Sequence, residues 1–110
     1  MIVEKGYLWS SPHGDTIEFS DDRVSIYHQA RQLNGTWNDE CAHLFLTLTQ
    51  QYDYLDRNGR PTARPFVRDI EPIDLTCNYQ LMPQDRRWKL ILTPDPLLYL
   101  GASNTVYYSS

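Results

Sequence analysis

The stretch Ile73-Asp74-Leu75-Thr76-Cys77-Asn78-Tyr79-Gln80-Leu81 decides the fold of this chain. Every second residue in it is apolar, and the residues between are polar. A period of two sends successive side chains to opposite faces of an extended strand, so one face is suited to burial and the other to water. No segment has a helical stripe of comparable strength, whereas the same alternation recurs in Val24–His28, Leu44–Thr49 and Trp88–Leu92. The pattern predicts one antiparallel β domain.

Length and composition limit the fold and the partners. At 110 residues the chain matches a single domain spanning residues 1–110. Only two cysteines occur, Cys41 and Cys77, which excludes a disulfide framework of the small secreted type, and we expect reduced thiols. A net charge of −4 and scattered basic residues argue against a nucleic-acid-binding surface. Neither a secretory leader nor an apolar run of about 20 residues is visible, so we expect a cytoplasmic protein that does not span a membrane.

Turn-forming residues divide the sequence into about eight short strands. The predicted strands are Val3–Ser10, Thr16–Ser20, Arg23–Gln29, His43–Gln50 with an extension toward Tyr54, Ile70–Met82, Arg87–Thr93, Leu97–Leu100 and Thr105–Tyr108. The last two are expected to form a final hairpin around the turn formers of residues 101–104.

Three segments between these strands are expected to be irregular. Asn34-Gly35 predicts a hairpin turn of type I′, because both central residues of that turn need a positive φ. Asn38-Asp39-Glu40 is expected to be a polar loop or a brief bulge. The segment Asp56–Asp69 combines turn residues with four arginines and is expected to be the longest loop. Pro72 predicts an edge or a bulge at the start of the strand that follows.

Short strands joined by tight turns favour an all-β fold. We expect a single antiparallel meander that closes, fully or in part, into a small barrel, because closure removes unpaired strand edges. A two-sheet β-sandwich is the alternative. An α+β fold with a short helix near Asp39–Ala42 or Arg57–Arg68 also stays open.

No motif in the sequence names a reaction. Cys41-Ala42-His43 is one pair of metal-ligand residues, whereas a structural zinc site needs two such pairs. Neither a nucleophile elbow nor a Gly-rich phosphate loop occurs. We therefore assign no catalytic residue, no metal site and no cofactor.

Two groups of side chains are candidate binding residues. Aromatic rings at strand positions that can face a barrel interior would hold a small apolar ligand, or else fill the core: Trp9, Trp37, Tyr79 and Trp88. Guanidinium groups bind phosphate or carboxylate in pairs, so the arginines of the predicted loop form a candidate anion site, or else a solvated loop: Arg57, Arg60, Arg64 and Arg68.

The order of several short motifs resembles that of the small bacterial lipocalin-like domains. The motifs are Gly6-Tyr7-Leu8-Trp9, the hairpin Ile17–Val24, Gly35-Thr36-Trp37, Leu44–Thr49 and Trp88–Leu92. The resemblance implies a meandering barrel, usually without assigned catalysis and with room for a ligand cavity. It transfers no functional residue, and the present chain differs from longer lipocalins in its size and its arginine-bearing loop.

These observations predict a noncatalytic binding module that holds a small apolar or aromatic molecule. The alternative is a protein–protein interaction module, such as an inhibitor, immunity or accessory subunit. It would use a strand edge or the tyrosines near the C-terminus, Tyr99, Tyr107 and Tyr108, and a homodimer is compatible with it. A third hypothesis, a small hydrolase or isomerase, would depend on His28 or His43.

Overall fold

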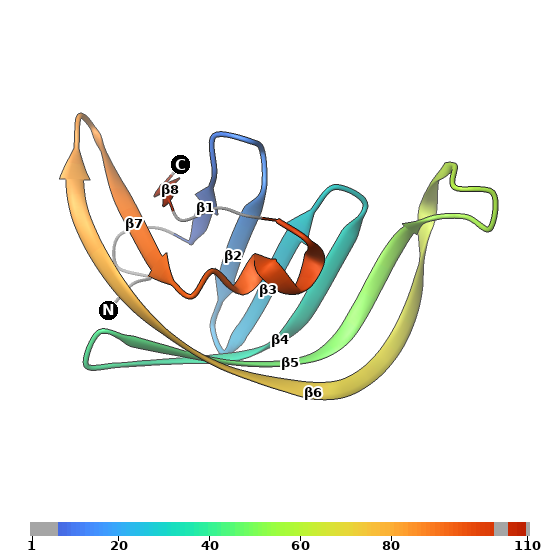
Figure 1. The fold of residues 1–110 in the computed structure, drawn as a ribbon, viewed down its shortest axis with the longest axis horizontal. Helices are drawn as coiled ribbons and strands as arrows, with labels where there is room; N and C mark the ends of the chain where they lie inside the picture. Colours follow the sequence, from blue (N-terminus) through green and yellow to red (C-terminus); the bar gives the residue numbers. More distant parts are fainter. Residues whose placement is uncertain (1–6, 103–105, 110) are drawn as a thin grey trace.

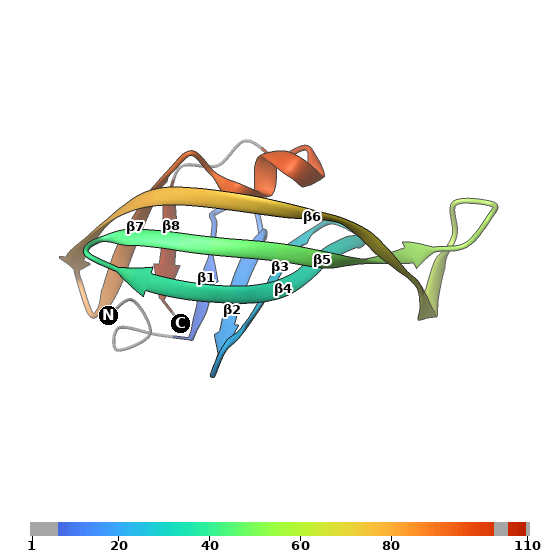
Figure 2. The ribbon, with the colours of Figure 1, turned by 90° about the horizontal axis from the view of Figure 1, so that it is seen from below.

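The part of the chain that the structure describes forms an eight-stranded antiparallel β-barrel whose strands follow one another around the ring in chain order (Figures 1 and 2). The computed structural model describes residues 7–102 and 106–109. Its elements are β1 (Leu8–Ser10), β2 (Thr16–Ser20), β3 (Arg23–His28), β4 (Arg31–Glu40), β5 (His43–Leu55), β6 (Pro61–Gln84), β7 (Arg87–Thr93), the 3-10 helix η2 (Pro96–Leu100) and β8 (Val106–Ser109). The ring closes because β8 pairs with both β7 and β1. The predicted all-β meander is confirmed.

Alternating burial builds the core, as the sequence pattern predicts. In β5, Leu44, Leu46 and Leu48 are fully buried, while Phe45 between them is 40% exposed. The other strands supply apolar side chains to the same interior, among them Trp9, Ile17, Phe19, Val24, Ile26, Leu33, Leu90, Leu92 and Tyr107. Burial of a large apolar side chain stabilises a fold by about 1.5–3 kcal/mol. The strands of the described residues therefore share one hydrophobic core.

The strand β6 is far longer than a barrel of this size needs. At a rise of about 3.3 Å per residue its 24 residues would span roughly 80 Å if straight, whereas the longest dimension of the molecule is 43 Å. The strand bends instead, and Figure 1 shows it as an arc. The register with β5 shifts where residues 70–72 of β6 lie opposite one residue of β5. Pro72 falls in this irregularity, as predicted.

The hairpin predicted at Asn34-Gly35 is wrong, because both residues lie inside β4. A β-carbon on Gly35 would lie 1.8 Å from the backbone oxygen of Thr47 in β5. Gly35 therefore permits a close approach of two strands at a bulge in their register. The real turn is Gln29-Ala30, closed by the pair His28 and Arg31.

The polar loop or bulge predicted at Asn38-Asp39-Glu40 is also wrong, since β4 continues through these residues in unbroken register with β5. The turn into β5 is made by Cys41 and Ala42, whose φ angles are 51° and 63°. Two successive positive φ angles are the geometry of a type I′ turn, although neither residue type is usual there. A short helix near Asp39–Ala42 does not form.

The long loop predicted at Asp56–Asp69 is mostly strand. Only residues 56–60 turn, and Asp56 Oδ1 accepts hydrogen bonds from the backbone N–H groups of Asn58 (2.8 Å) and Arg60 (2.9 Å). Gly59, with φ at +76°, completes this turn. From Pro61 the chain is extended in β6, so no helix forms at Arg57–Arg68.

Near the C-terminus, the strand predicted at Leu97–Leu100 is a 3-10 helix. Asp95 caps it by accepting from the backbone N–H of Leu97, and Gly101 (φ 90°) ends it. The final strand is confirmed at Val106–Ser109 but does not form the expected hairpin with Leu97–Leu100. Residues 3–6 of the first predicted strand, residues 103–104 of the predicted turn and Thr105 lie outside the described residues. Among the residues described, no helix is long and apolar enough to cross a membrane.

Candidate functional site

The four aromatic residues predicted to bind a ligand lie in the core or against it. Trp9 is fully buried, whereas Trp37, Tyr79 and Trp88 are partly buried and pack against the core. Trp37 meets Phe19 edge-to-face at 5.1 Å between ring centroids. The Tyr79 hydroxyl donates to Asp39 Oδ1 at 2.6 Å. These contacts show the rings in structural positions, and none of the four borders the surface hollows described below.

The four predicted arginines lie on a projecting hairpin that we call the arm, defined as residues 50–69. It comprises the end of β5, the turn at residues 56–60 and the start of β6. In Figures 1 and 2 it extends well beyond the rest of the barrel. Arg57 and Arg60 lie in the turn and Arg64 and Arg68 on β6, and all four are exposed.

The arm continues the inner wall of the barrel. Residues directly opposite each other in an antiparallel sheet share a face. The buried Ile26 lies opposite the buried Leu33, Leu33 lies opposite Gln51, and Gln51 lies opposite Arg68. Gln51 and Arg68 are therefore on the same face of the sheet as the core residues.

The next row outward runs from His28 through Arg31 and Asp53 to Phe66. These residues therefore lie on the extension of the core-facing side. His28 still contacts Asp15 of the β1–β2 connection, whereas Phe66 lies on the arm, beyond the rest of the barrel. This explains why Phe66 is 71% exposed although its face of the sheet is the inner one.

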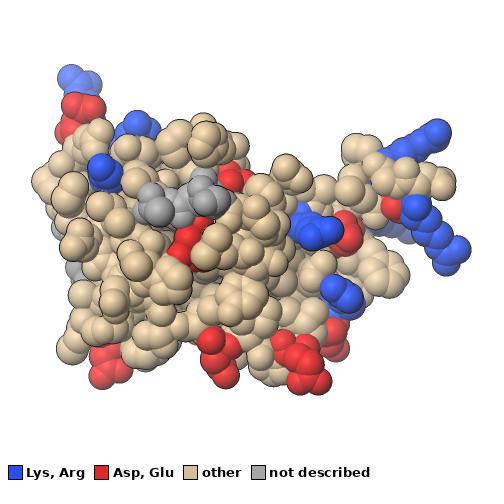
Figure 3. All heavy atoms as spheres, in the orientation of Figure 1, with Lys and Arg blue, Asp and Glu red and all other residues tan. Residues whose placement is uncertain are grey.

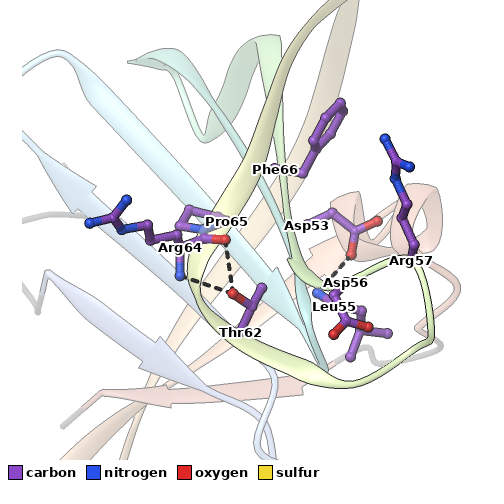
Figure 4. Close-up of a pocket in the computed structure, with 8 residues that line it drawn as sticks. All are labelled: Asp53, Leu55, Asp56, Arg57, Thr62, Arg64, Pro65 and Phe66. Atoms are coloured by element: carbon purple, nitrogen blue, oxygen red, sulfur yellow. Dashed lines mark hydrogen bonds between the residues drawn. The ribbon is translucent and has the colours of Figure 1, made fainter.

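Two adjoining hollows lie on the arm. The larger, of about 550 Å³, is at the tip, and Figure 4 shows its lining residues. The second, of about 360 Å³, is lined by Arg31, Gln51, Asp53, Phe66 and Arg68. Asp53 and Phe66 line both, so the two hollows form one continuous surface. In Figure 4 Phe66 and Arg57 project to the same side of the arm, whereas Arg64 projects in another direction. The four arginines therefore share the arm without forming a single clamp.

The charges of the arm are not neutralised within the described residues. No arginine of the arm lies within ion-pair distance of a carboxylate there, and Arg68 donates instead to the amide oxygen of Gln51 at 3.1 Å. The arm carboxylates accept hydrogen bonds from neutral groups: Asp53 from the Leu55 N–H, Asp56 from its own turn, and Asp69 from Gln50. The arm thus presents exposed guanidinium groups beside an exposed phenyl ring. In Figure 3 these basic atoms project at the arm end of the molecule.

A separate hollow of about 330 Å³ lies between β6 and η2. It is lined mainly by apolar side chains and by the buried Asp95, which accepts a 2.7 Å hydrogen bond from the Tyr107 hydroxyl. Burial raises the pKa of the Cys77 thiol beneath it to about 11, with a smaller contribution from the charge of Asp95. Tyr107 is fully buried, which corrects its expected place on an exposed C-terminal face, whereas Tyr99 is 56% exposed.

Elsewhere, His28 Nδ1 and Asp15 Oδ1 are 2.7 Å apart in a half-buried pair. The side chains described contain no cluster of three or more His, Cys, Asp or Glu residues that could hold a metal ion. His43 lies on the exposed wall, where its ring stacks on Phe45.

Sequence reasoning found the arginines but missed Phe66, Arg31 and Gln51. The available signal was the spacing of Phe66 and Arg68, which a strand places on one face, but the turn residues around them favoured a loop. Comparison with family models, with curated proteins and with solved structures finds no match to this chain.

Proposed function

We propose that this protein is a noncatalytic binding module that engages another protein chain through the arm. The observation that carries the proposal is the 71% exposure of Phe66 on a sheet face that elsewhere forms the core. Exposed apolar groups gathered on one surface mark interaction sites more often than scattered ones do. Leu55, which lines the tip hollow together with Phe66, is 39% exposed, whereas the exposed Val67 lies on the opposite face of the arm.

The shape of the arm favours a macromolecular partner over a small molecule. Its hollows are open surface depressions at the end of the molecule, whereas small ligands are mostly enclosed by concave pockets. Aromatic and arginine side chains are also the residue types enriched where interfaces derive most of their binding energy. The arm offers both types side by side.

Site-specific photo-crosslinking tests the proposal. A photoreactive phenylalanine analogue replaces Phe66 in the full chain expressed in its native cells, and the same analogue at Phe45 is the matched control. Phe45 is also an exposed phenyl side chain (40%), but it lies on the barrel wall. We expect a discrete protein adduct from position 66 that is absent from position 45. Equal labelling at both positions, or no protein adduct from position 66, contradicts the proposal.

Binding of a small apolar ligand by Trp9, Trp37, Tyr79 and Trp88 stays a prediction. It has less support in the geometry, because these rings pack in the core or against it. Tryptophan fluorescence titrated with a panel of small apolar molecules tests it directly. A saturable shift that survives loss of Phe66 would favour a small ligand over the arm-bound partner.

A further inference from the structure

We infer that the partner of the arm is an acidic protein segment that carries at least one apolar side chain. The inference rests on the proposed function and names the chemistry of the partner. It follows from three features of the arm: cationic groups without anionic partners, an apolar ring between them, and a strand edge that does not favour backbone pairing.

The first feature is the set of unpaired arginines. The arm holds four of the ten basic residues of the chain but three of its fourteen acidic ones, so it is a cationic surface on a molecule of net charge −4. Arg31 adds a fifth guanidinium at the second hollow. Within residues 7–102 and 106–109 none of the five lies within ion-pair distance of a carboxylate. Guanidinium groups bind carboxylates in a bidentate manner, which gives both attraction and orientation.

The second feature is the position of Phe66 among these charges. Phe66 lines both hollows, with Arg57 in the tip hollow and Arg31 and Arg68 in the other. A segment seated along this surface would place carboxylates on the guanidinium groups at either end and an apolar side chain on the ring. The two hollows together extend over the guanidinium groups and the Phe66 ring, so one short segment fits this surface better than a single ion does.

The third feature separates this mode of binding from strand addition. The described part of β7 pairs with β6 only from Asn78 onward, which leaves the first part of β6 as an edge. That edge contains Pro65 and Pro72, which lack an N–H group, and proline is one way in which natural sheets prevent pairing at an edge. The segment is therefore recognised by side chains rather than by a new ladder of backbone hydrogen bonds.

The same charges disfavour a nucleic acid. Outside the arm the chain has six basic and eleven acidic residues, so a long polyanion would be repelled beyond the arm. Three aspartates also lie within the arm itself. A short cationic surface with interspersed carboxylates suits a segment of mixed acidic and apolar character, in which the apolar groups can lie beside Asp53.

Selection of peptides provides the test. A random library of displayed 12-residue peptides is selected on the wild-type chain after depletion on the double variant R57Q/R68Q. We expect the selected peptides to be enriched in Asp and Glu around an apolar residue. A synthetic peptide from the selection should bind the double variant at least about fivefold more weakly, and binding to the wild type should weaken as salt is raised.

The matched control is R23Q/R86Q, which removes the same charge from two exposed arginines at turns of the barrel. This control should bind the peptide within about twofold of the wild type. Its net charge changes as much as that of R57Q/R68Q, but the removed charges lie away from the arm and are screened. Equal urea midpoints of the three proteins exclude unfolding as the cause.

Several outcomes overturn the inference. Selected peptides without acidic residues, no selectable peptides, or equal loss of binding in both double variants would each contradict it. Tighter binding of a 20-nucleotide single-stranded DNA with the same dependence on Arg57 and Arg68 would indicate a nucleic-acid site. Self-association abolished by R57Q/R68Q would indicate a second copy of this chain. A protein adduct at position 66 together with non-acidic selected peptides would leave the proposed function intact and remove only this inference.

Discussion

Replacement of Gly35 by alanine should destabilise the barrel more than any other single methyl group added at a described glycine. The ideal β-carbon would lie 1.8 Å from the Thr47 oxygen, 2.7 Å from its carbonyl carbon and 2.8 Å from the Leu48 α-carbon, all of them backbone atoms of β5. Real β-carbons essentially never approach other atoms to less than 3.0 Å, so the strands would have to move apart by about 1.2 Å.

The magnitude follows from what this separation breaks. Overpacking a rigid site costs about 1–3 kcal/mol, and each ladder hydrogen bond lost near Gly35 adds about 1 kcal/mol. We therefore expect G35A to lower the free energy of unfolding by about 3–5 kcal/mol, a large part of the roughly 5–15 kcal/mol typical of a domain. Equilibrium unfolding in urea, followed by tryptophan fluorescence, measures the loss.

Gly59→Ala is the matched control. A β-carbon there would have no atom within 4 Å, but the φ of +76° is unfavourable for alanine, which costs about 1–2 kcal/mol. G59A should therefore be destabilised less than G35A, and recovery of G35A only from the insoluble fraction while G59A stays soluble would agree. Equal urea midpoints for G35A and wild type, or a larger loss in G59A, would refute the argument that Gly35 is required by strand proximity.

Three further predictions concern the buried polar groups and the thiols. Tyr107→Phe removes the 2.7 Å hydrogen bond to the buried Asp95 and should lower the free energy of unfolding by about 1–3 kcal/mol in the same urea assay, whereas Tyr99→Phe at an exposed ring should be neutral. Cys41 is exposed and Cys77 is buried, so a thiol reagent at pH 8 should label Cys41 rapidly and Cys77 only on unfolding. Peptide mapping measures the two labelling rates, and equal rates would contradict the packing around Cys77. Folding raises the pKa of Cys77 from 9.0 to about 11, so as the pH rises the unfolded state loses the thiol proton at a lower pH than the folded state does. The free energy of unfolding should therefore fall between pH 9 and pH 11. Burial also raises the pKa of Tyr27, which acts in the same direction. Cys77→Ala should flatten the alkaline slope of the urea midpoint against pH, and an unchanged slope would show that Cys77 does not contribute.

The period of two in the sequence was enough to predict the barrel but not all of its turns. Leu75 and Cys77 alternate with Thr76 because one face of β6 lines the core, and that constraint acts residue by residue. Turn positions depend instead on which strands meet. Asn34-Gly35 has ideal turn chemistry, yet the approach of β5 requires the glycine inside a strand, and Cys41-Ala42 turns without any of the usual residues because the neighbouring strands are already paired.

The strand pairing within the arm was not predicted, for a related reason. Pro61, Pro65 and Gly59 indicate a loop when each is considered locally, but a proline is tolerated on a strand whose N–H side has no partner. Only the structure shows that β6 pairs with β5 along its first part and with β7 along its last. The arginines were therefore recognised as a cluster while their arrangement on a continuing sheet face was not.

This division of β6 between two neighbours links the fold to the proposed binding surface. Inner-facing side chains of the barrel are covered by other elements, but along the row from His28 to Phe66 this cover is lost: His28 contacts Asp15, whereas Phe66 is 71% exposed. An apolar row at this position would expose a large hydrophobic face, which favours aggregation. Instead, the charged side chains Arg31, Asp53 and Arg68 line the hollow beside the exposed ring of Phe66. These charges keep the surface hydrated, and the ring remains available for contact with a partner. Phe66→Ser should therefore abolish binding of the selected peptide without changing the urea midpoint, since the ring contributes to binding and little to the core.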